Sequence, residues 1–149
     1  MNELKPFDDA LAGLITSLTP KARKALAVTI AKRLRASQQQ RIKRQQAPDG
    51  TPYAARKSQP LRKPKGRIKH EMFAKLRTAR YMKANSSPDA AVVEFAGRVE
   101  RMAAVHHFGL RDRPNVHSKD VQYDERPLLG FGKQDMRTIE AVIISCIIK

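Results

Sequence analysis

The sequence has no tryptophan, one cysteine and few aromatic residues, which make up 5% of its 149 residues. A single cysteine, Cys146, excludes an internal disulfide framework and a zinc site built from clustered thiolates. We expect Cys146 to behave as a small buried hydrophobic residue. The longest nearly apolar run is residues 141–148, whereas a membrane helix needs about 20 apolar residues. No hydrophobic stretch follows the N-terminal methionine, so we expect no secretory signal and a soluble protein made inside the cell.

Acidic residues and large apolar residues are also scarce. The chain has 14 Asp and Glu against 30 Lys and Arg, which gives a formal net charge of +16. Leu, Ile, Val and Phe together number 33, about 22% of the chain, just above the level of about 20% below which highly charged chains are usually disordered. We therefore expect one domain over residues 1–149 with a thin core, which leaves extended segments or apolar surface for partner subunits to bury.

The positive charge is concentrated in residues 21–83. This segment holds 20 of the 30 basic residues and only two acidic ones, Asp49 and Glu71, so its net charge is +18. Such a block attracts polyanions, because Lys and Arg neutralise phosphates and release their counterions. An acidic protein partner or a solvated basic face would explain the same composition. The sequence carries no zinc finger, RNA-recognition signature or helix-turn-helix spacing.

The N-terminal third of the sequence predicts two helices. Apolar residues recur at helical spacing over residues 6–18, and an aspartate near the start can cap this helix. Thr19 and Pro20 then provide an N-cap and a first-turn proline for a second helix that extends to about Gln46. Its apolar stripe is narrow, so we expect its C-terminal half to project from the core or to pack in an assembly.

A basic loop follows the long helix. Pro48, Asp49 and Gly50 form a turn that ends the helix. Residues 51–67 contain three prolines, a glycine and six Lys or Arg residues, so we expect a loop that is mobile or ordered only by a partner. The chain then divides into a helical arm (1–47), a basic Pro/Gly loop (48–67) and an α+β part with a C-terminal helix (68–149).

The middle of the chain predicts an antiparallel hairpin. One or two helical turns start at Ile68 and lead into a strand over residues 76–84. A turn at 85–89 separates it from a second strand at 90–95, which is rich in β-branched residues. The predicted fold class is therefore α+β, with long N-terminal helices, a small antiparallel sheet in the middle and a C-terminal helix.

The last third predicts two further helices. Residues 98–108 have a helical pattern that Gly109 ends. A long polar loop covers 110–125, and a short apolar segment covers 126–131. From Lys133 onward the apolar residues recur at helical spacing. A strand is the competing interpretation, because Ile and Val are dense near the C-terminus.

The residues that could carry chemistry do not form a recognisable site. His106 and His107 are adjacent, so on a helix they point about 100° apart and are poor ligands for one metal ion. Adjacent acidic residues likewise point in different directions, whereas general acid/base catalysis needs two carboxylates that converge on one cleft. The segment from Gly130 to Lys133 lacks the other elements of a phosphate-binding loop. We therefore expect no metal, no cofactor and no enzymatic activity.

Three segments carry a family resemblance. APDGTPYAAR (47–56) follows the long basic helix, AVHHFGLRDRP (104–114) ends a helix, and YDERPLLGF (123–131) precedes the C-terminal helix. In this order and spacing they resemble the virion morphogenesis family of tailed phages. The resemblance runs from the N-terminus to about Phe131, after which the chain is unusually apolar. More distantly, the pattern is similar to the head–tail connector and tail-completion proteins of long-tailed phages.

The resemblance implies a structural virion protein that completes the tail and acts at its head-proximal end, in the neck. It implies a ring of six subunits, with the tail terminator or tail tube and the head connector as further partners. It also implies non-specific contact with passing DNA, no membrane, assembly in the host cytoplasm and a final place in the virion. The residues that match the motifs are fold and assembly residues: Pro48, Asp49, Gly50, Phe108, Gly109, Arg126, Pro127, Leu129 and Gly130.

We expect a set of basic residues to face the lumen of the ring or a partner. These residues are Arg41, Lys43, Arg44, Arg62, Lys63, Lys65 and Arg67. An acidic protein is preferred as the partner over passing DNA, because DNA that must move should not be held tightly. The alternative function is a basic nucleic-acid-binding module of ribosomal or nucleoid type, which would bind polyanions with a steep salt dependence.

Overall fold

The computed structural model describes residues 5–56 and 71–148, and within them the chain has an α+β fold. The helices and strands, in chain order, are α1 (Lys5–Thr16), α2 (Pro20–Lys43), β1 (Met82–Ser86), β2 (Ala91–Phe95), α3 (Gly97–Phe108), β3 (Arg111–Asp112), β4 (Val121–Gln122) and α4 (Lys133–Ile148). The α+β prediction is confirmed. The C-terminal segment is a helix, so the competing strand interpretation is wrong.

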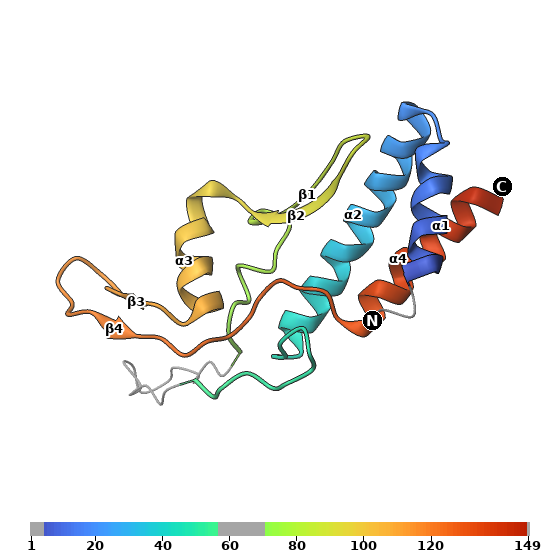
Figure 1. Cartoon of the computed structure of the whole chain (residues 1–149). Helices are drawn as coiled ribbons and strands as arrows, with labels where there is room; N and C mark the ends of the chain where they lie inside the picture. Colours follow the sequence, from blue (N-terminus) through green and yellow to red (C-terminus); the bar gives the residue numbers. More distant parts are fainter. Residues whose placement is uncertain (1–4, 57–70, 149) are drawn as a thin grey trace.

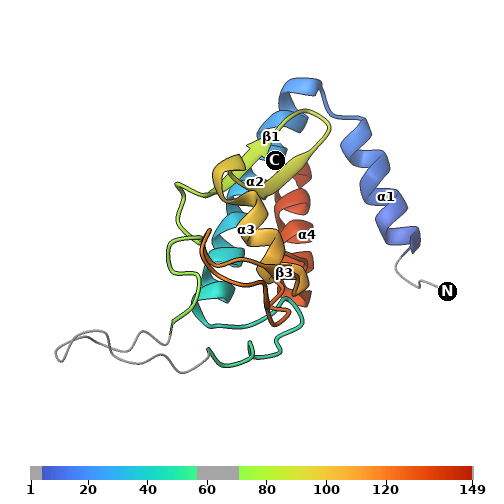
Figure 2. The same cartoon turned by 90° about the vertical axis from the view of Figure 1, so that its left-hand side faces the viewer.

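Helix α2 is the scaffold against which the other elements are arranged. Figure 1 shows the β1–β2 hairpin on one side of α2 and helices α1 and α4 on the other. Helix α3 and the small β3–β4 pair lie beyond the hairpin. Figure 2 shows that α1 leans away from the layer that the remaining elements form. The long helix is therefore a central support.

The ends of α2 follow from local sequence. The Thr19 hydroxyl accepts a hydrogen bond from the backbone N–H of Ala22 (3.1 Å), and Pro20 occupies the first turn, as predicted. The helix ends at Lys43, three residues before the predicted end. Gln45 adopts a left-handed conformation (φ 58°), and its side chain exchanges two hydrogen bonds with the backbone of Met72 (2.8 and 2.9 Å). A contact with a distant segment therefore ends the helix early.

One face of the C-terminal half of α2 is buried, so the prediction that this half projects from the core is wrong, while its packing in an assembly stays a prediction. Ile42 is fully inaccessible, and the polar side chains of Gln38 and Arg41 are almost as deeply buried. Both polar side chains bind Asp135 of α4, which lies 97 and 94 residues further along the chain. Because this partner is so distant in sequence, the polar positions on α2 were misread as a solvent-facing surface.

The hydrophobic core consists of two clusters that share α2. The larger cluster contains Ile42, Leu76, Met82, Val99, Ala103 and Leu128, with Tyr53, Phe73, Tyr81, Val93, Phe95 and Leu129 packed against it. The smaller cluster contains Leu11, Leu26, Val142 and Ile143, with Ile15, Leu18, Ile30, Ile139, Cys146 and Ile147 beside it. Cys146 is half-buried. The larger cluster joins α2 to the hairpin and α3, and the smaller one joins α2 to α1 and α4.

The β1–β2 hairpin is confirmed, but its first strand begins later than predicted. The strands pair antiparallel from Met82 opposite Phe95 to Ser86 opposite Ala91. Before Met82 the chain forms tight turns instead of a strand, since the backbone N–H groups of Tyr81 and Met82 both donate to the carbonyl of Thr78 (3.0 and 2.8 Å). The predicted strand over 76–84 is therefore displaced toward the C-terminus.

The predicted polar loop at 110–125 contains the short antiparallel pair β3–β4, which sequence reasoning missed. Gly109 ends α3 in the left-handed conformation (φ 66°), as predicted. Most of the expected basic loop, residues 57–67, lies outside the described residues, as does the helical start expected at Ile68. Among the described helices, none is both long and apolar enough to cross a membrane.

Candidate functional site

The three motif segments, residues 47–56, 104–114 and 123–131, meet in the folded chain, and we call this region the motif junction. Arg126 joins all three segments. Its guanidinium donates to the carbonyl oxygens of Ala54 (3.0 Å) and Ala55 (3.2 Å), and its backbone N–H donates to the carbonyl of His106 (2.8 Å). The Arg126 side chain is buried. Segment 123–131 is therefore fixed between the other two.

Two further hydrogen bonds hold the backbone next to Arg126. The Tyr53 hydroxyl donates to the carbonyl of Pro127 (2.7 Å), and burial raises the pKa of Tyr53 to about 12. The backbone N–H of Leu128 donates to Nδ1 of His107 (3.1 Å). Burial lowers the pKa of His107, with Glu125 opposing the shift, which favours the neutral ring that can accept this bond. Side chains from both neighbouring segments thus position residues 127 and 128.

Glycines allow the segments to approach closely. A Cβ atom on Gly109 would lie 2.8 Å from the backbone nitrogen of Glu125, and one on Gly130 would lie 2.7 Å from Cγ of Pro48. Both separations are shorter than ordinary contact distances, so a side chain at either position would push the segments apart. The φ of 66° at Gly109 adds a second reason for glycine there.

The turn at the start of the junction is closed by its own residues. The Asp49 carboxylate accepts from the backbone N–H of Thr51 (2.9 Å), and this bond lowers the pKa of Asp49. The backbone N–H of Gly50 donates to the carbonyl of Ala47 (2.9 Å), and Gly50 has φ 89°. The predicted turn at Pro48, Asp49 and Gly50 is confirmed, while an assembly role for these residues stays a prediction.

A buried ion pair lies beside the junction, between α2 and α4. Nη1 of Arg41 is 3.1 Å from Oδ2 of Asp135, and their side chains are 7% and 3% exposed. Burial lowers the pKa of Arg41, and the charge of Asp135 opposes that shift. The same Asp135 oxygen accepts from the backbone N–H of Gly132 (2.8 Å), the residue just before α4, which stabilises the helix start as half of a capping box does.

Neutral side chains complete this buried polar cluster, which we define as Ser37, Gln38, Arg41 and Asp135. The Ser37 hydroxyl donates to Asp135, and Arg41 donates to the side-chain oxygen of Gln38. That oxygen also accepts from the backbone N–H of Gly130 (3.1 Å). The expectation that Arg41 faces a lumen or partner is therefore wrong: its charge is used inside the subunit.

The other predicted basic residues divide into two groups. Lys43 and Arg44 are exposed at the end of α2, so they are available to a partner. The rest lie outside the described residues: Arg62, Lys63, Lys65 and Arg67.

Two aromatic side chains of the motifs point outward. Phe108 is 63% exposed and Phe131 is 67% exposed. Neither is needed to fill the core, whereas Leu129, between them in the motif set, is half-buried and packs against the larger cluster. Phe131 ends the third motif, yet sequence reasoning did not select it as a site residue. Exposed large apolar residues of this kind are suited to contact another protein.

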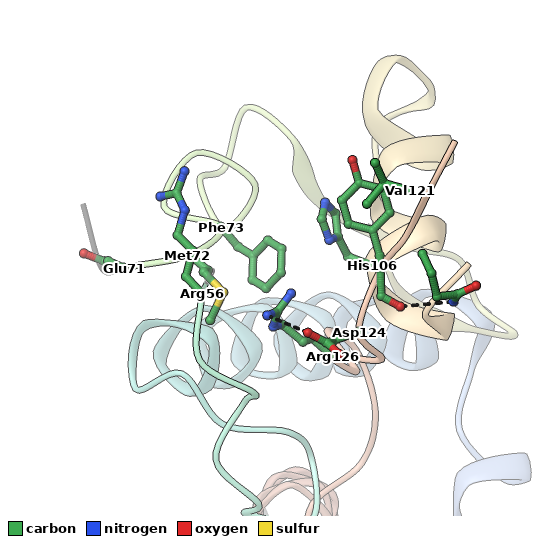
Figure 3. A pocket seen from close by; sticks show the side chains of 10 residues that line it. Arg56, Glu71, Met72, Phe73, His106, Val121, Asp124 and Arg126 are labelled. Carbon is green, nitrogen blue, oxygen red and sulfur yellow. Dashed lines mark hydrogen bonds and ion pairs between the residues drawn. The ribbon is translucent and has the colours of Figure 1, made fainter. Parts of the chain in front are cut away.

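A pocket of ≈ 340 Å³ opens beside the motif junction. Figure 3 shows Phe73, His106 and Arg126 pointing toward it from different segments. The His106 ring contacts the rings of Phe73 (centroids 5.1 Å apart) and Tyr123 (4.9 Å). Burial lowers the pKa of His106, and the positive charge of Arg126 lowers it further. Within the described residues, no group of three or more His, Cys, Asp or Glu could hold a metal ion.

Comparison with known proteins identifies the class. The model of the phage virion morphogenesis family matches residues 2–147, and the chain belongs to this family. It is similar to Tail completion protein S of Escherichia phage P2, with 49% identity over 146 residues that cover 97% of each chain. No solved structure matches the chain.

The family match extends further than the motifs indicated. It includes nearly all of α4, whereas the resemblance drawn from the sequence stopped near Phe131. The apolar C-terminal helix is therefore part of the family pattern. Both the family and the phage P2 relative concern phages, and neither supports the ribosomal or nucleoid alternative.

Proposed function

We propose that this protein completes the phage tail as a structural component of the virion. The observation that carries the proposal is the 49% identity, over 97% of both chains, with a protein named for tail completion. The motif junction supports it, because its buried arginine, glycines and turns fix backbone geometry. In this function the motif residues maintain the fold and present the exposed Phe108 and Phe131 to neighbouring proteins.

The protein acts at the head-proximal end of the tail as a ring of six subunits, between the tail terminator or tail tube and the head connector. It assembles in the host cytoplasm and stays in the virion. Support for self-association comes from α4, where Met136 is 49%, Ile144 39% and Ile148 78% exposed. A thin core and exposed apolar side chains on α4 both favour contact with further subunits.

The mass of the purified protein and its binding to isolated tails test this proposal. We expect sedimentation as one discrete oligomer that binds tails from a phage lacking this protein. Replacing Met136 and Ile148 together with serine should shift the protein to the monomer and abolish tail binding. Val116→Ser is the control, because Val116 is 85% exposed in a loop outside α4. A wild-type protein that stays monomeric contradicts the ring, and failure to bind tails contradicts tail completion.

A further inference from the structure

The solvent-facing side of α2 is strongly basic. Helix α2 contains no acidic residue, and no Lys or Arg on this side forms a salt bridge within the described residues. All of these side chains are exposed except Arg35, which is half-exposed. We call this surface the α2 basic face: Lys21, Lys24, Lys32, Arg33, Arg35, Lys43 and Arg44.

The cations of this face repeat every 11 residues. The repeat occurs in three sets: Lys21, Lys32 and Lys43; Lys24 and Arg35; Arg33 and Arg44. Eleven residues are three helical turns to within about 20°, so members of a set lie above one another. At a rise of about 1.5 Å per residue, neighbouring groups are about 16.5 Å apart and the outer groups about 33 Å apart. Lys21, Lys32 and Lys43 therefore form one line along the helix, with Lys24 and Arg35 about 60° to one side of it and Arg33 and Arg44 about 100° to the other. The helix presents three evenly spaced cationic groups along its axis, each spread around this line.

This spacing fits the backbone of duplex DNA. One turn of the duplex measures about 34–36 Å, so one strand returns to the same side of the duplex after that distance and the other strand crosses in between. We propose that the α2 basic face binds duplex DNA with the helix along the DNA axis. The outer groups bind phosphates of one strand, and the middle group binds phosphates of the other.

The shape of the surface favours DNA over an acidic protein. The hairpin lies on one flank of α2 and helices α1 and α4 lie on the other, as Figure 1 shows, so the basic face is a strip along the part of the helix that they leave exposed. The outer groups match the repeat of the duplex, whereas a folded acidic surface has no fixed repeat. Because Lys and Arg bind phosphates, we expect little dependence on base sequence. The inference rests on the proposed function only for the source of the duplex, the DNA that leaves through the tail.

A pair of variants separates spacing from net charge. The first removes the middle group by three substitutions: Lys32→Gln, Arg33→Gln and Arg35→Gln. The second keeps those substitutions and adds three lysines one turn further along the same side, which restores the net charge: Ala36→Lys, Gln39→Lys and Gln40→Lys. The control removes three exposed cations outside α2: Arg98→Gln, Arg111→Gln and Lys119→Gln. Far-UV circular dichroism and the urea midpoint check that each variant is folded.

Binding to two unrelated 40-bp duplexes is measured by fluorescence anisotropy between 50 and 200 mM salt. Loss of three phosphate contacts should flatten the slope of log K against log salt by up to about 2.7, which corresponds to a loss of up to about 500-fold in affinity at 0.1 M salt. We expect the relocated variant to bind nearly as weakly as the neutralised one, and the control to keep most of the wild-type affinity on both duplexes.

Two results would overturn the proposal. If the relocated variant binds as the wild type does, only net charge matters and the 11-residue spacing is irrelevant. If the neutralised variant binds DNA normally but no longer binds isolated tails, the face contacts an acidic protein instead. The proposed function is assessed separately by tail binding of the wild-type protein, so loss of DNA affinity with normal tail binding leaves tail completion intact.

Discussion

Replacing Asp135 with asparagine removes the only negative charge of the buried polar cluster. Arg41, 7% exposed, then keeps a positive charge with no carboxylate beside it. Breaking a buried pair in this way costs about 3–5 kcal/mol, because the remaining charge is desolvated and uncompensated. Domains of this size are stabilised by only about 5–15 kcal/mol in total. We therefore expect Asp135→Asn to remove about a fifth or more of the free energy of unfolding.

Urea denaturation followed by far-UV circular dichroism measures this loss. With a slope near 2 kcal/mol per molar urea, the midpoint should fall by about 1.5–2.5 M while the slope is unchanged. Asp120→Asn is the matched control: Oδ1 of Asp120 is 3.4 Å from Nε of Arg113, and their side chains are 59% and 63% exposed. Exposed pairs of this kind contribute about 1 kcal/mol or less. Equal losses in both variants would refute the reasoning.

A double variant tests whether the cost comes from the unpaired charge. Arg41→Met with Asp135→Leu replaces both charged groups by apolar side chains. Such replacements are often neutral or stabilising, because two desolvated charges are removed together. We expect the double variant to be more stable than Asp135→Asn. A double variant that is less stable would show that the polar cluster itself supplies the stability.

Three other predictions concern the motif junction and its surroundings. Gly109→Ala should lower the free energy of unfolding by more than about 1 kcal/mol. Gly109 has a positive φ, and a Cβ atom there would clash with the backbone of Glu125. Gly97 has open space around it, so Gly97→Ala should leave the free energy of unfolding unchanged in the same urea assay. Because burial lowers the pKa of His106 below 6.5, its stabilising contribution is complete above pH 6.5 and is lost as the pH falls below that value. The urea midpoint should therefore decline as the pH falls below 6.5, and the decline should be smaller in His106→Phe. Phe131→Ser should change stability by no more than about 0.5 kcal/mol but reduce the infectious titre when supplied to a phage lacking the protein.

Features that depend on neighbouring residues were predictable from the sequence. Thr19 and Pro20 begin α2, and Gly109 ends α3, because each effect involves only the adjacent turn of backbone. The helical spacing of apolar residues after Lys133 predicted α4, although the density of Ile and Val left a strand as the competing interpretation. The same holds for the hairpin, where a β-branched strand lies next to a turn.

Features that depend on distant partners were not predictable in the same way. Arg41 was interpreted as a surface cation because its partner Asp135 lies 94 residues further along the chain, so no nearby residue indicates the ion pair. The first strand was placed too early because Phe73 adopts a left-handed conformation (φ 66°) and the chain turns before Met82. The motifs singled out Arg126, but they did not show that it binds the other two segments.

The most direct test of tail completion is to image particles made by the phage with and without this protein. Electron microscopy of lysates from the deletion should show filled heads and separate tails, with few joined virions. Supplying the wild-type protein should restore joined particles and infectious titre together. Normal numbers of joined, infectious particles in the deletion would contradict a role in tail completion.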